Sequence, residues 1–466
     1  MPEYKTPGVY IEEIPKLPPS IASVETAIPA FIGYTEKARL KEDDDLHLKP
    51  YRIASLLEYE QYFGLAQPET SIEVTFDLTN PSKIDVQGKI NPALASKFLM
   101  YYSLQLFFAN GGGPCYITSV GSYTSTGGIV MDGDLSDGLD EVAKINEVTL
   151  ILFPDGLNIT AAGNYYALYK EALDQCAELK DRFAVMDVWI DPDITVNNVQ
   201  VLRDFDFGTI DTLKYGAVYY PRLFTRLDYY YNNVDTAVKI NGVAGATTLA
   251  ELKGVNNAFY FMAKNAITNI ELLLPASSGV VGQYATVDNS RGVWKAPANV
   301  GIDLAIRPEK IITGKEQADL NVDTTSGKSI NVIRSFPGRG PAIIWGARTL
   351  AGNDNEWRYI PVRRFFNMVE ESTKNATEQF VFEPNDRNTW VRVKAMIENY
   401  LTQQWKAGAL MGASTKEAFF VHIGLGETMT ELDIWEGRMI VEIGMAVVRP
   451  AEFIILRFMH KMLSES

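Results

Sequence analysis

A nearly continuous apolar run occupies residues 452–459 (EFIILRFM), close to the end of the chain. Such a run is stable as a central strand with both faces buried, and it is an aggregation hazard where it is exposed. A second strand-forming triplet, VYI at residues 9–11, lies among five prolines, which supply no hydrogen-bond donor to a sheet. This triplet cannot fold alone, so it is either a loose tail or a strand that completes a sheet elsewhere.

The long middle of the chain has the pattern of an α/β protein. Residues 148–153 and 183–190 are predicted strands, and the helix predicted between them at 165–179 favours a right-handed parallel crossover. Further helices are predicted at 55–63 with Ser55 as N-cap, 91–109, 275–284, 363–376 and 388–407 with Asn388 as N-cap, and further strands at 27–34, 115–120, 330–333, 343–345, 357–362, 418–423 and 438–448. The expected fold class is therefore α/β, with α+β character.

Charge is distributed unevenly along the chain. Residues 331–466 contain 16 Lys/Arg and 16 Asp/Glu, so the first 330 residues carry the whole formal net charge of −15. A negative charge of this size argues against nucleic acid or an anionic membrane as the main partner. A neutral last third joined to an acidic remainder suggests one zone packed against other protein and another zone facing solvent.

The cysteine count and the N-terminal pattern indicate a compartment. Cys115 and Cys176 are too few for a disulfide framework. The opening residues (MPEYK) lack the pattern of a secretory signal, and no segment has the roughly 18 consecutive apolar residues of a membrane span. We therefore expect the protein to be made and assembled in the cytoplasm.

Two glycine-containing segments resemble nucleotide-binding loops only in part. Residues 326–329 (SGKS) match the end of a phosphate-binding loop, but the leading glycine of that motif is replaced by Val322. Residues 111–113 (GGG) follow a predicted helix and precede a predicted strand, which is the reverse of a dinucleotide-binding turn. We expect a polar turn at the first segment and a helix stop at the second.

Residues suited to catalysis or metal binding are sparse. The three histidines, His47, His422 and His460, lie in different predicted elements and none has a His or Cys at metal-ligand spacing. A Ser-His-Asp triad needs no sequence motif, although His422 lies in a strand pattern typical of a structural histidine. The acidic run at 42–45 has the pattern of a solvated loop. We expect no enzyme, no cofactor and no metal; the alternatives are an α/β hydrolase or carbohydrate-binding protein, and a non-contractile capsid or scaffold protein.

Both ends of the chain resemble the tail sheath family of contractile phages and related extracellular injection systems. Residues 4–13 (YKTPGVYIEE) are similar to the start of that family, and residues 28–33 (IPAFIG) to the stretch after it. The stronger similarity is C-terminal, at residues 345–350 (WGARTL), 357–364 (WRYIPVRR), 382–385 (FEPN), 389–390 (TW), 405–412 (WKAGALMG) and 449–454 (RPAEFI). Residues 1–35 and 331–460, about a third of the chain, carry the resemblance.

The resemblance implies a structural sheath subunit and not an enzyme. Members of such a family stack as sixfold, hexameric rings in a helical assembly around an inner tube and contract to drive the tube through a target envelope. The implied partners are copies of the same chain, an inner tube protein, and baseplate and terminal cap proteins, with no nucleic acid and no direct membrane insertion. The particle would be a phage tail or a phage-tail-like particle, either released or membrane-anchored.

The resemblance also assigns roles to the chain ends, where arms from neighbouring subunits add strands to the sheet of a third subunit. The implied strand-exchange residues are Val9, Tyr10, Ile11, Phe453, Ile454, Ile455 and Leu456. A sheath must grip its tube reversibly, which favours charged contacts. We therefore expect Arg457 and Lys461, at the margin of the neutral region, to face acidic groups on the tube.

These expectations divide the chain into five segments. The ends are an extended N-terminal arm at 1–20 and a C-terminal strand arm at 449–466. The inner assembly domain is expected to combine residues 21–90 with residues 331–448. Residues 91–330 would form one or more middle, outer α/β domains, with an exposed insertion near 228–256 that is rich in tyrosine, asparagine and small residues.

Overall fold

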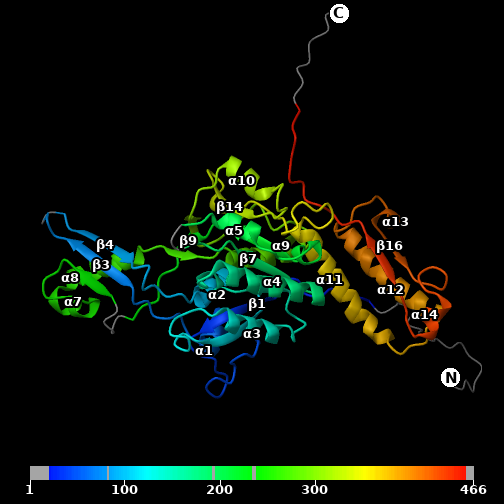
Figure 1. Ribbon diagram of the computed structural model, residues 1–466, viewed down its shortest axis with the longest axis horizontal. Coiled ribbons are helices and arrows are strands. Elements are labelled where there is room, and N and C mark those ends of the chain that lie inside the picture. The colour runs from blue at the N-terminus through cyan, green and yellow to red at the C-terminus, as the bar shows by residue number, and fades with distance from the viewer. Residues whose placement is uncertain (1–19, 81–82, 192–194, 233–237, 458–466) are drawn as a thin grey trace, which may run out of the picture. The chain divides into compact units, whose positions relative to one another are not determined.

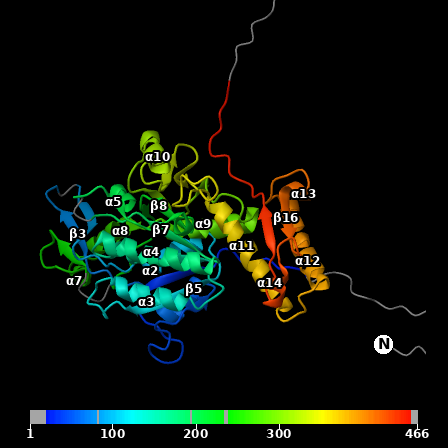
Figure 2. The ribbon, with the colours of Figure 1, turned by 45° about the vertical axis from the view of Figure 1, so that its right-hand side comes forward.

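The computed structural model describes residues 20–80, 83–191, 195–232 and 238–457, and Figures 1 and 2 show its ribbon. The chain divides into two compact units. The described part of unit 1 is residues 20–24 and 371–448, and that of unit 2 is residues 25–370 and 449–457. Both contain helices and strands, so the predicted mixed α/β class is confirmed.

A nine-stranded sheet forms the centre of unit 2. Its strand order is β12-β15-β14-β8-β7-β6-β1-β5-β2. The six strands from β14 to β5 are parallel to their neighbours, and the strands at both margins are antiparallel. The strands are β1 (Pro29–Thr35), β2 (Tyr51–Ile53), β5 (Cys115–Ser122), β6 (Leu150–Leu152), β7 (Phe183–Asp187), β8 (Gly216–Tyr220), β12 (Val300–Gly301), β14 (Asn331–Phe336) and β15 (Gly340–Ile344).

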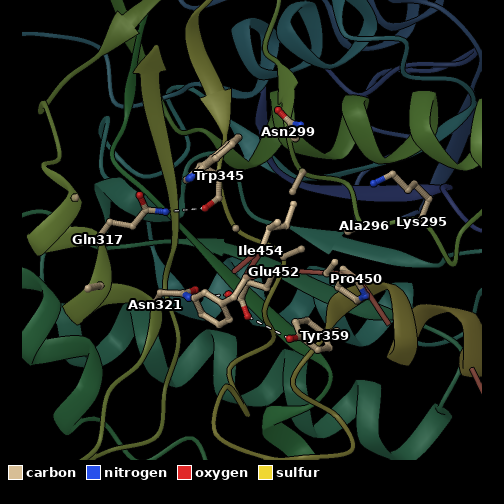
Figure 3. A pocket seen from close by; sticks show the side chains of 17 residues that line it. Lys295, Ala296, Asn299, Gln317, Asn321, Trp345, Tyr359, Pro450, Glu452 and Ile454 are labelled. Carbon is tan, nitrogen blue, oxygen red and sulfur yellow. Dashed lines mark hydrogen bonds between the residues drawn. The ribbon is translucent and has the colours of Figure 1, made fainter. Parts of the chain in front are cut away.

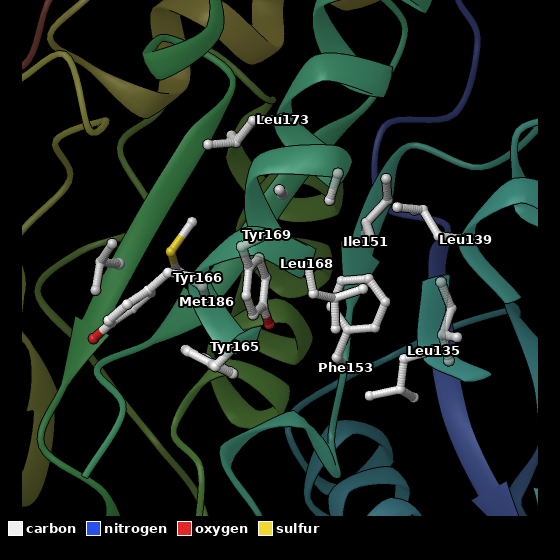
Figure 4. Close-up of a cluster of buried hydrophobic side chains, with 14 of the residues drawn as sticks. Leu135, Leu139, Ile151, Phe153, Tyr165, Tyr166, Leu168, Tyr169, Leu173 and Met186 are labelled. Atoms are coloured by element: carbon white, nitrogen blue, oxygen red, sulfur yellow. The ribbon is translucent and has the colours of Figure 1, made fainter. Parts of the chain in front are cut away.

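Both faces of this sheet are covered, which explains why its central strands are apolar without interruption. Side chains alternate between faces along a strand. Thus Ala30 and Ile32 of β1 join one buried cluster, whereas Phe31 joins the other. Helices α3 (Asp132–Val142) and α4 (Ala162–Leu179) pack in the first cluster, part of which Figure 4 shows, and α2 (Met100–Ala109) and α9 (Ser277–Arg291) pack in the second.

The sequence predicted several of these elements well. Strand β6, helix α4 and strand β7 form the expected parallel crossover. Helix α1 (Leu56–Phe63) begins after its predicted N-cap, because the Ser55 hydroxyl accepts a hydrogen bond from the backbone NH of Glu58. The predicted helix at 275–284 is the first part of α9.

Three predicted boundaries are corrected. The helix predicted at 91–109 begins only at Met100, where its first backbone NH groups bind a distant carboxylate, that of Asp155. Helix α12 (Arg387–Lys406) is capped by the side chain of Asp386 and not by Asn388. The strand predicted at 357–362 is replaced by one bridge, between Arg348 and Tyr359, followed by the start of α11 (Ile360–Thr377).

Two segments far apart in sequence form a small module within unit 2. Strands β10 (Lys239–Asn241), β3 (Ile72–Asp77) and β4 (Asp85–Ile90) form a three-stranded sheet in that order. One face packs on α7 (Leu249–Val255) and α8 (Asn257–Thr268), which are labelled at the left of Figure 1. Ile240, Ala246 and Leu252 are buried there, so the segment expected to be an exposed insertion near 228–256 contributes side chains to a folded core. Other residues between them, such as Lys239 and Glu251, are exposed.

The division into units also differs from the expected inner assembly domain at 331–448. Strands β14 and β15 belong to the nine-stranded sheet, because β14 pairs with β8 and β15 pairs with β14. The C-terminal part of unit 1 therefore begins at Glu371, within α11. The remaining elements of unit 2 are β9 (Leu223–Thr225), β11 (Leu272–Leu274), β13 (Ala305–Pro308), α5 (Asn198–Asp204), α6 (Ile210–Leu213) and α10 (Gly314–Asn321).

Unit 1 is built on α12. Several side chains of this helix are buried, among them Val393, Ile397 and Leu401. The helix packs against β16 (Phe419–His422), which forms a two-stranded sheet with β17 (Glu442–Met445). The incoming segment at 20–24 is fixed to this unit, since Ser23 hydrogen-bonds to the Tyr400 hydroxyl at 3.1 Å. Short helices α13 (Thr415–Ala418) and α14 (Glu431–Trp435) complete it, and Figure 2 labels them.

We predict that Leu252→Ala will loosen the small module by about 2–5 kcal/mol, the usual cost of a cavity at a fully buried leucine. Hydrogen exchange should show lost amide protection in β3, β10 and α7, with β1 and β7 unchanged. Val255→Ala, on the same helix but 51% exposed, is the matched control and should change protection little. Equal protection in both variants would contradict the module's independent core.

Candidate assembly surfaces

The last described residues form an exposed, extended segment. Phe453, Ile454, Ile455 and Leu456 are 69–79% exposed, and within the described residues they pair with no strand. Sequence analysis predicted a strand here, and the main-chain donors and acceptors of such a strand remain available to a partner. Arg457 is also exposed, at the end of the described chain.

The root of this segment is held by unit 2. The Glu452 carboxylate accepts hydrogen bonds from Arg348 Nη2 at 2.6 Å, Arg348 Nε at 3.0 Å and Asn321 Nδ2 at 2.7 Å. The Tyr359 hydroxyl adds a fourth bond at 3.2 Å, which Figure 3 shows. Residues 450–454 form one wall of a cavity of about 700 Å³ whose other walls include α10 and Trp345.

The β16–β17 sheet has only two strands in the described part of the chain, so each strand has an outer edge. Directly after β17, an isolated bridge pairs Val447 with Leu410, so the outer edge beside β17 is free only along the strand itself. Its antiparallel register pairs Phe419 with Met445 and His422 with Glu442. A two-stranded sheet is only marginally stable by itself, and α12 packs against β16. Such a sheet can accept further strands at its edges.

Unit 1 exposes many large apolar side chains for its size. Phe382, in a left-handed backbone conformation with φ of 67°, is fully exposed, and Trp435 is 79% exposed. Further exposed apolar side chains in this unit are Val381, Val391, Met411, Phe420, Leu425, Leu432 and Ile440. Exposed apolar surface of this density is typical of an interaction surface.

The remaining predicted site residues lie outside the described residues. These are Val9, Tyr10 and Ile11 of the N-terminal arm and Lys461 of the C-terminal arm. Their proposed roles stay predictions.

Two adjacent arginines of the segment 357–364 are buried at the start of α11. Arg364 forms an ion pair with Asp288 of α9, donates to the Thr26 carbonyl at 2.9 Å, and lies over the Tyr284 ring. Arg363 donates to Glu370 and packs against the ring of Trp357 at 4.6 Å. Removing one partner of the buried Arg364–Asp288 pair costs about 3–5 kcal/mol, so Arg364 holds the start of α11 on α9. Sequence analysis named both arginines only as part of the resemblance.

The two loop-like motifs have structural roles. The ammonium group of Lys328 is buried and donates to the carbonyls of Arg203 at 2.6 Å and Phe205 at 2.5 Å, and burial lowers the pKa of Lys328. It is therefore directed into the protein and not toward a phosphate. Gly111, with φ of +85°, ends α2 in a conformation that other residues adopt only with strain. The expected helix stop is confirmed, whereas the turn before β14 lies at residues 324–326, slightly earlier than expected.

Two buried aspartates, Asp155 and Asp187, lie at the carboxyl ends of neighbouring parallel strands, where many α/β proteins bind ligands. Burial raises the pKa of Asp155 to about 7 and that of Asp187 to about 6, against the opposing effect of their hydrogen bonds. Asp155 accepts from the NH groups of Tyr34, Leu99 and Met100, and Asp187 accepts from those of Ala276 and Ser277. Each carboxylate thus caps the N-terminus of a helix, α2 or α9.

Among the described residues, no group of three or more His, Cys, Asp or Glu side chains is arranged to hold a metal ion. Burial raises the pKa of both thiols, at Cys115 and Cys176, well above the ordinary value. His422 contacts Glu427 at the surface of β16. A helix both long enough and apolar enough to span a bilayer is likewise absent from the described part.

The exposed apolar segment and the β16–β17 sheet both lie in a region that matches a known protein family. A family model described as the phage tail sheath C-terminal domain matches residues 352–460. The tail sheath protein of Vibrio phage KVP40 is 26% identical over 129 residues, which are 28% of this chain and 19% of that protein.

Solved structures match almost the whole chain. The sheath complex of an extracellular contractile injection system, PVC, in the contracted state has 31% identity and a TM-score of 0.66, covering 99% of each chain. A chain of the anti-feeding prophage baseplate has 31% identity and a TM-score of 0.63, covering 98% of this chain and 100% of its own. The contracted helical sheath of the anti-feeding prophage has 30% identity and a TM-score of 0.64, with the same coverage. The chain belongs to the tail sheath family of contractile injection systems.

We predict that Asp155→Asn will destabilise unit 2 by about 1–3 kcal/mol, because an amide NH2 would face one of the three bound NH groups. Between the unfolded pKa of about 3.9 and the folded pKa of about 7, the native aspartate binds a proton that the unfolded chain has lost. The stability of the wild type therefore falls as pH rises through this range, and that of the variant lacks this contribution. Denaturant unfolding measures the free energy of unfolding of the wild type and of the variant at about pH 5 and about pH 8. The difference between the two proteins should be smaller at the higher pH, and a larger difference there would contradict the raised pKa.

Proposed function

We propose that this protein is the sheath subunit that stacks in sixfold rings around an inner tube and shortens to drive the tube through a target envelope. The observation that carries the proposal is the exposed apolar segment at 453–456, on a chain whose unit 1 presents an open two-stranded sheet. The matched PVC and anti-feeding prophage structures are described as contracted sheaths and as a sixfold-symmetrised baseplate, which supports the same geometry here.

In the proposed assembly, residues 453–456 of one subunit, and Val9, Tyr10 and Ile11 of another, add strands to the β16–β17 sheet of a third. Strand addition satisfies main-chain hydrogen bonds, which are the same for any strand, and buries alternate apolar side chains. Burying each large apolar side chain favours association by about 1.5–3 kcal/mol before entropy costs. Arms that carry these bonds keep subunits connected while the subunit bodies rotate and slide.

The proposal assigns the protein a mechanical role and no catalytic one. Contraction would release energy stored at assembly as the interfaces between rings grow, so no nucleotide is required. The buried carboxylates Asp155 and Asp187 already bind backbone NH groups, and Lys328 binds backbone carbonyls. These groups therefore serve the fold, which agrees with a structural role.

The proposed partners are other copies of this chain, an inner tube protein, and baseplate and terminal cap proteins. Assembly would take place in the cytoplasm, with the finished particle released or anchored to a membrane. Arg457, which is exposed, and Lys461 would face acidic groups on the tube.

We predict that deleting residues 453–466 will leave a soluble, folded subunit that forms no sheath. Glu452 is kept because it belongs to the contacts of unit 2. Electron microscopy and circular dichroism measure polymer and fold, respectively. A full-length control in which the four exposed residues 453–456 are replaced by serine should lose assembly as well. A truncated chain that is unfolded would place the segment in its own core and overturn the arm proposal.

We predict that reversing the charges of Arg457 and Lys461 to Glu will weaken co-purification of sheath and tube. Sheaths without tube should still form, and the effect should diminish with added salt, because salt screens exposed charges. The matched control reverses two exposed lysines elsewhere in the chain, Lys315 and Lys416, and should leave tube binding intact. Unchanged tube binding by the first variant across a salt series would refute the contact.

A further inference from the structure

Two motifs that are about a hundred residues apart meet at one ion pair. Arg348 lies in the segment 345–350 and Glu452 in the segment 449–454, and their side chains are 4% and 20% exposed. The guanidinium binds the carboxylate through both Nε and Nη2. Such a bidentate pair fixes orientation as well as distance.

Arg348 is also held in place by contacts that do not involve Glu452. Its backbone NH donates to Asn331 Oδ1 at 2.8 Å, and its carbonyl accepts from Asn331 Nδ2 at 2.8 Å. Asn331 is buried in β14, and Arg348 Nη1 donates to the Gly352 carbonyl at 3.0 Å. The receptor for Glu452 is therefore built on the nine-stranded sheet.

The boundary between held and exposed chain falls directly after this pair. Glu452 contacts three side chains of unit 2, whereas the next four residues are 69–79% exposed. Figure 3 shows Glu452 beside Asn321 and Tyr359 at the cavity. The apolar segment thus begins with no linker after its point of attachment.

We propose that the Arg348–Glu452 pair is a positioning contact that fixes the origin of the C-terminal arm and so sets how far the arm reaches. The role of the arm in assembly rests on the proposed function, but the attachment itself does not. Arg449 stays attached because it donates to the Asn355 carbonyl at 2.7 Å. Losing the pair would therefore free residues 450–452 as additional linker, which at about 3.4 Å per extended residue adds up to roughly 10 Å of reach. A strand donor with a movable origin meets its acceptor sheet at a lower effective concentration.

The Arg348–Glu452 contact is suited to persist near neutral pH. Burial opposes ionisation of Glu452, but the hydrogen bonds from Arg348 and Asn321 outweigh it and lower the pKa of Glu452. The contact therefore contributes at pH values above the ordinary glutamate pKa and is lost only as pH falls through the lowered value.

The attachment can be tested on the free full-length subunit with nitroxide labels at Ala451→Cys and, separately, Ile455→Cys. Both positions are exposed, and the native Cys115 and Cys176 are buried, so labelling of the folded chain is selective. We expect the label at 451 to be immobile and the label at 455 mobile. Glu452→Ala and Arg348→Met should each make the label at 451 as mobile as that at 455. A label at 451 that is already mobile, or that stays immobile in both variants, overturns the proposal.

The matched control is Glu309→Ala, which removes a bidentate partner of Arg222 elsewhere in unit 2. It should leave the label at 451 immobile, which excludes a general effect of losing an ion pair. In sheath assembly, Glu452→Ala should raise the protein concentration required for polymer roughly tenfold, and Glu309→Ala should not. Unchanged assembly by Glu452→Ala refutes its role in reach. A wild-type chain with an immobile label at 451 that forms no polymer refutes the proposed function and leaves the attachment established.

Discussion

The strongest physical constraint on this protein is the exposure of the unpaired main-chain groups and apolar side chains of residues 453–456. They are four consecutive large apolar residues, each more than two thirds exposed, in extended backbone. A strand of this kind hydrogen-bonds only to water unless a partner sheet is supplied, and its exposed side chains favour any association that covers them. Under the proposed assembly, the rest of the molecule provides what such a segment requires, namely a fixed origin in unit 2 and a two-stranded acceptor sheet in unit 1 of a neighbouring subunit.

In the α/β body, buried side chains occupy the sheet edge at which proteins of this fold class often bind ligands. In many open parallel sheets, the carboxyl ends of the strands surround a ligand. Here Asp155 and Asp187 occupy that edge, and their carboxyl oxygens accept hydrogen bonds from the first backbone NH groups of α2 and α9, two helices on the same face of the sheet. A fold of this class supports many unrelated functions, so the side chains at this edge, and not the fold itself, bear on what the protein does.

Local patterns in the sequence predicted the parts of the fold that depend on local physics. The buried strand β1, the cap at Ser55 and the β6–α4–β7 crossover follow from apolar periodicity and from one hydroxyl at a helix start. Contacts between distant residues were not predictable. Helix α2 begins where its first backbone NH groups bind the Asp155 carboxylate. Residues 238–252 fold because strand β3, more than 150 residues earlier, pairs with β10. The segments containing Arg348 and Glu452 were both noted, but nothing in either segment indicates that the two side chains bind each other.

The position of the arm's origin matters because strand addition carries little geometric information of its own. Main-chain hydrogen bonds allow any extended segment to pair with any open edge, so specificity must come from what lies near the edge. An origin fixed at Glu452 limits residues 453–456 to acceptor sheets within a few residues' length, and a free origin would admit more distant ones. A buried arginine in a bidentate pair serves this purpose better than a lysine, because its planar group fixes direction as well as distance. Under the proposed assembly, the arrangement of neighbouring subunits is therefore determined as much by this one attachment as by the faces of the subunit bodies.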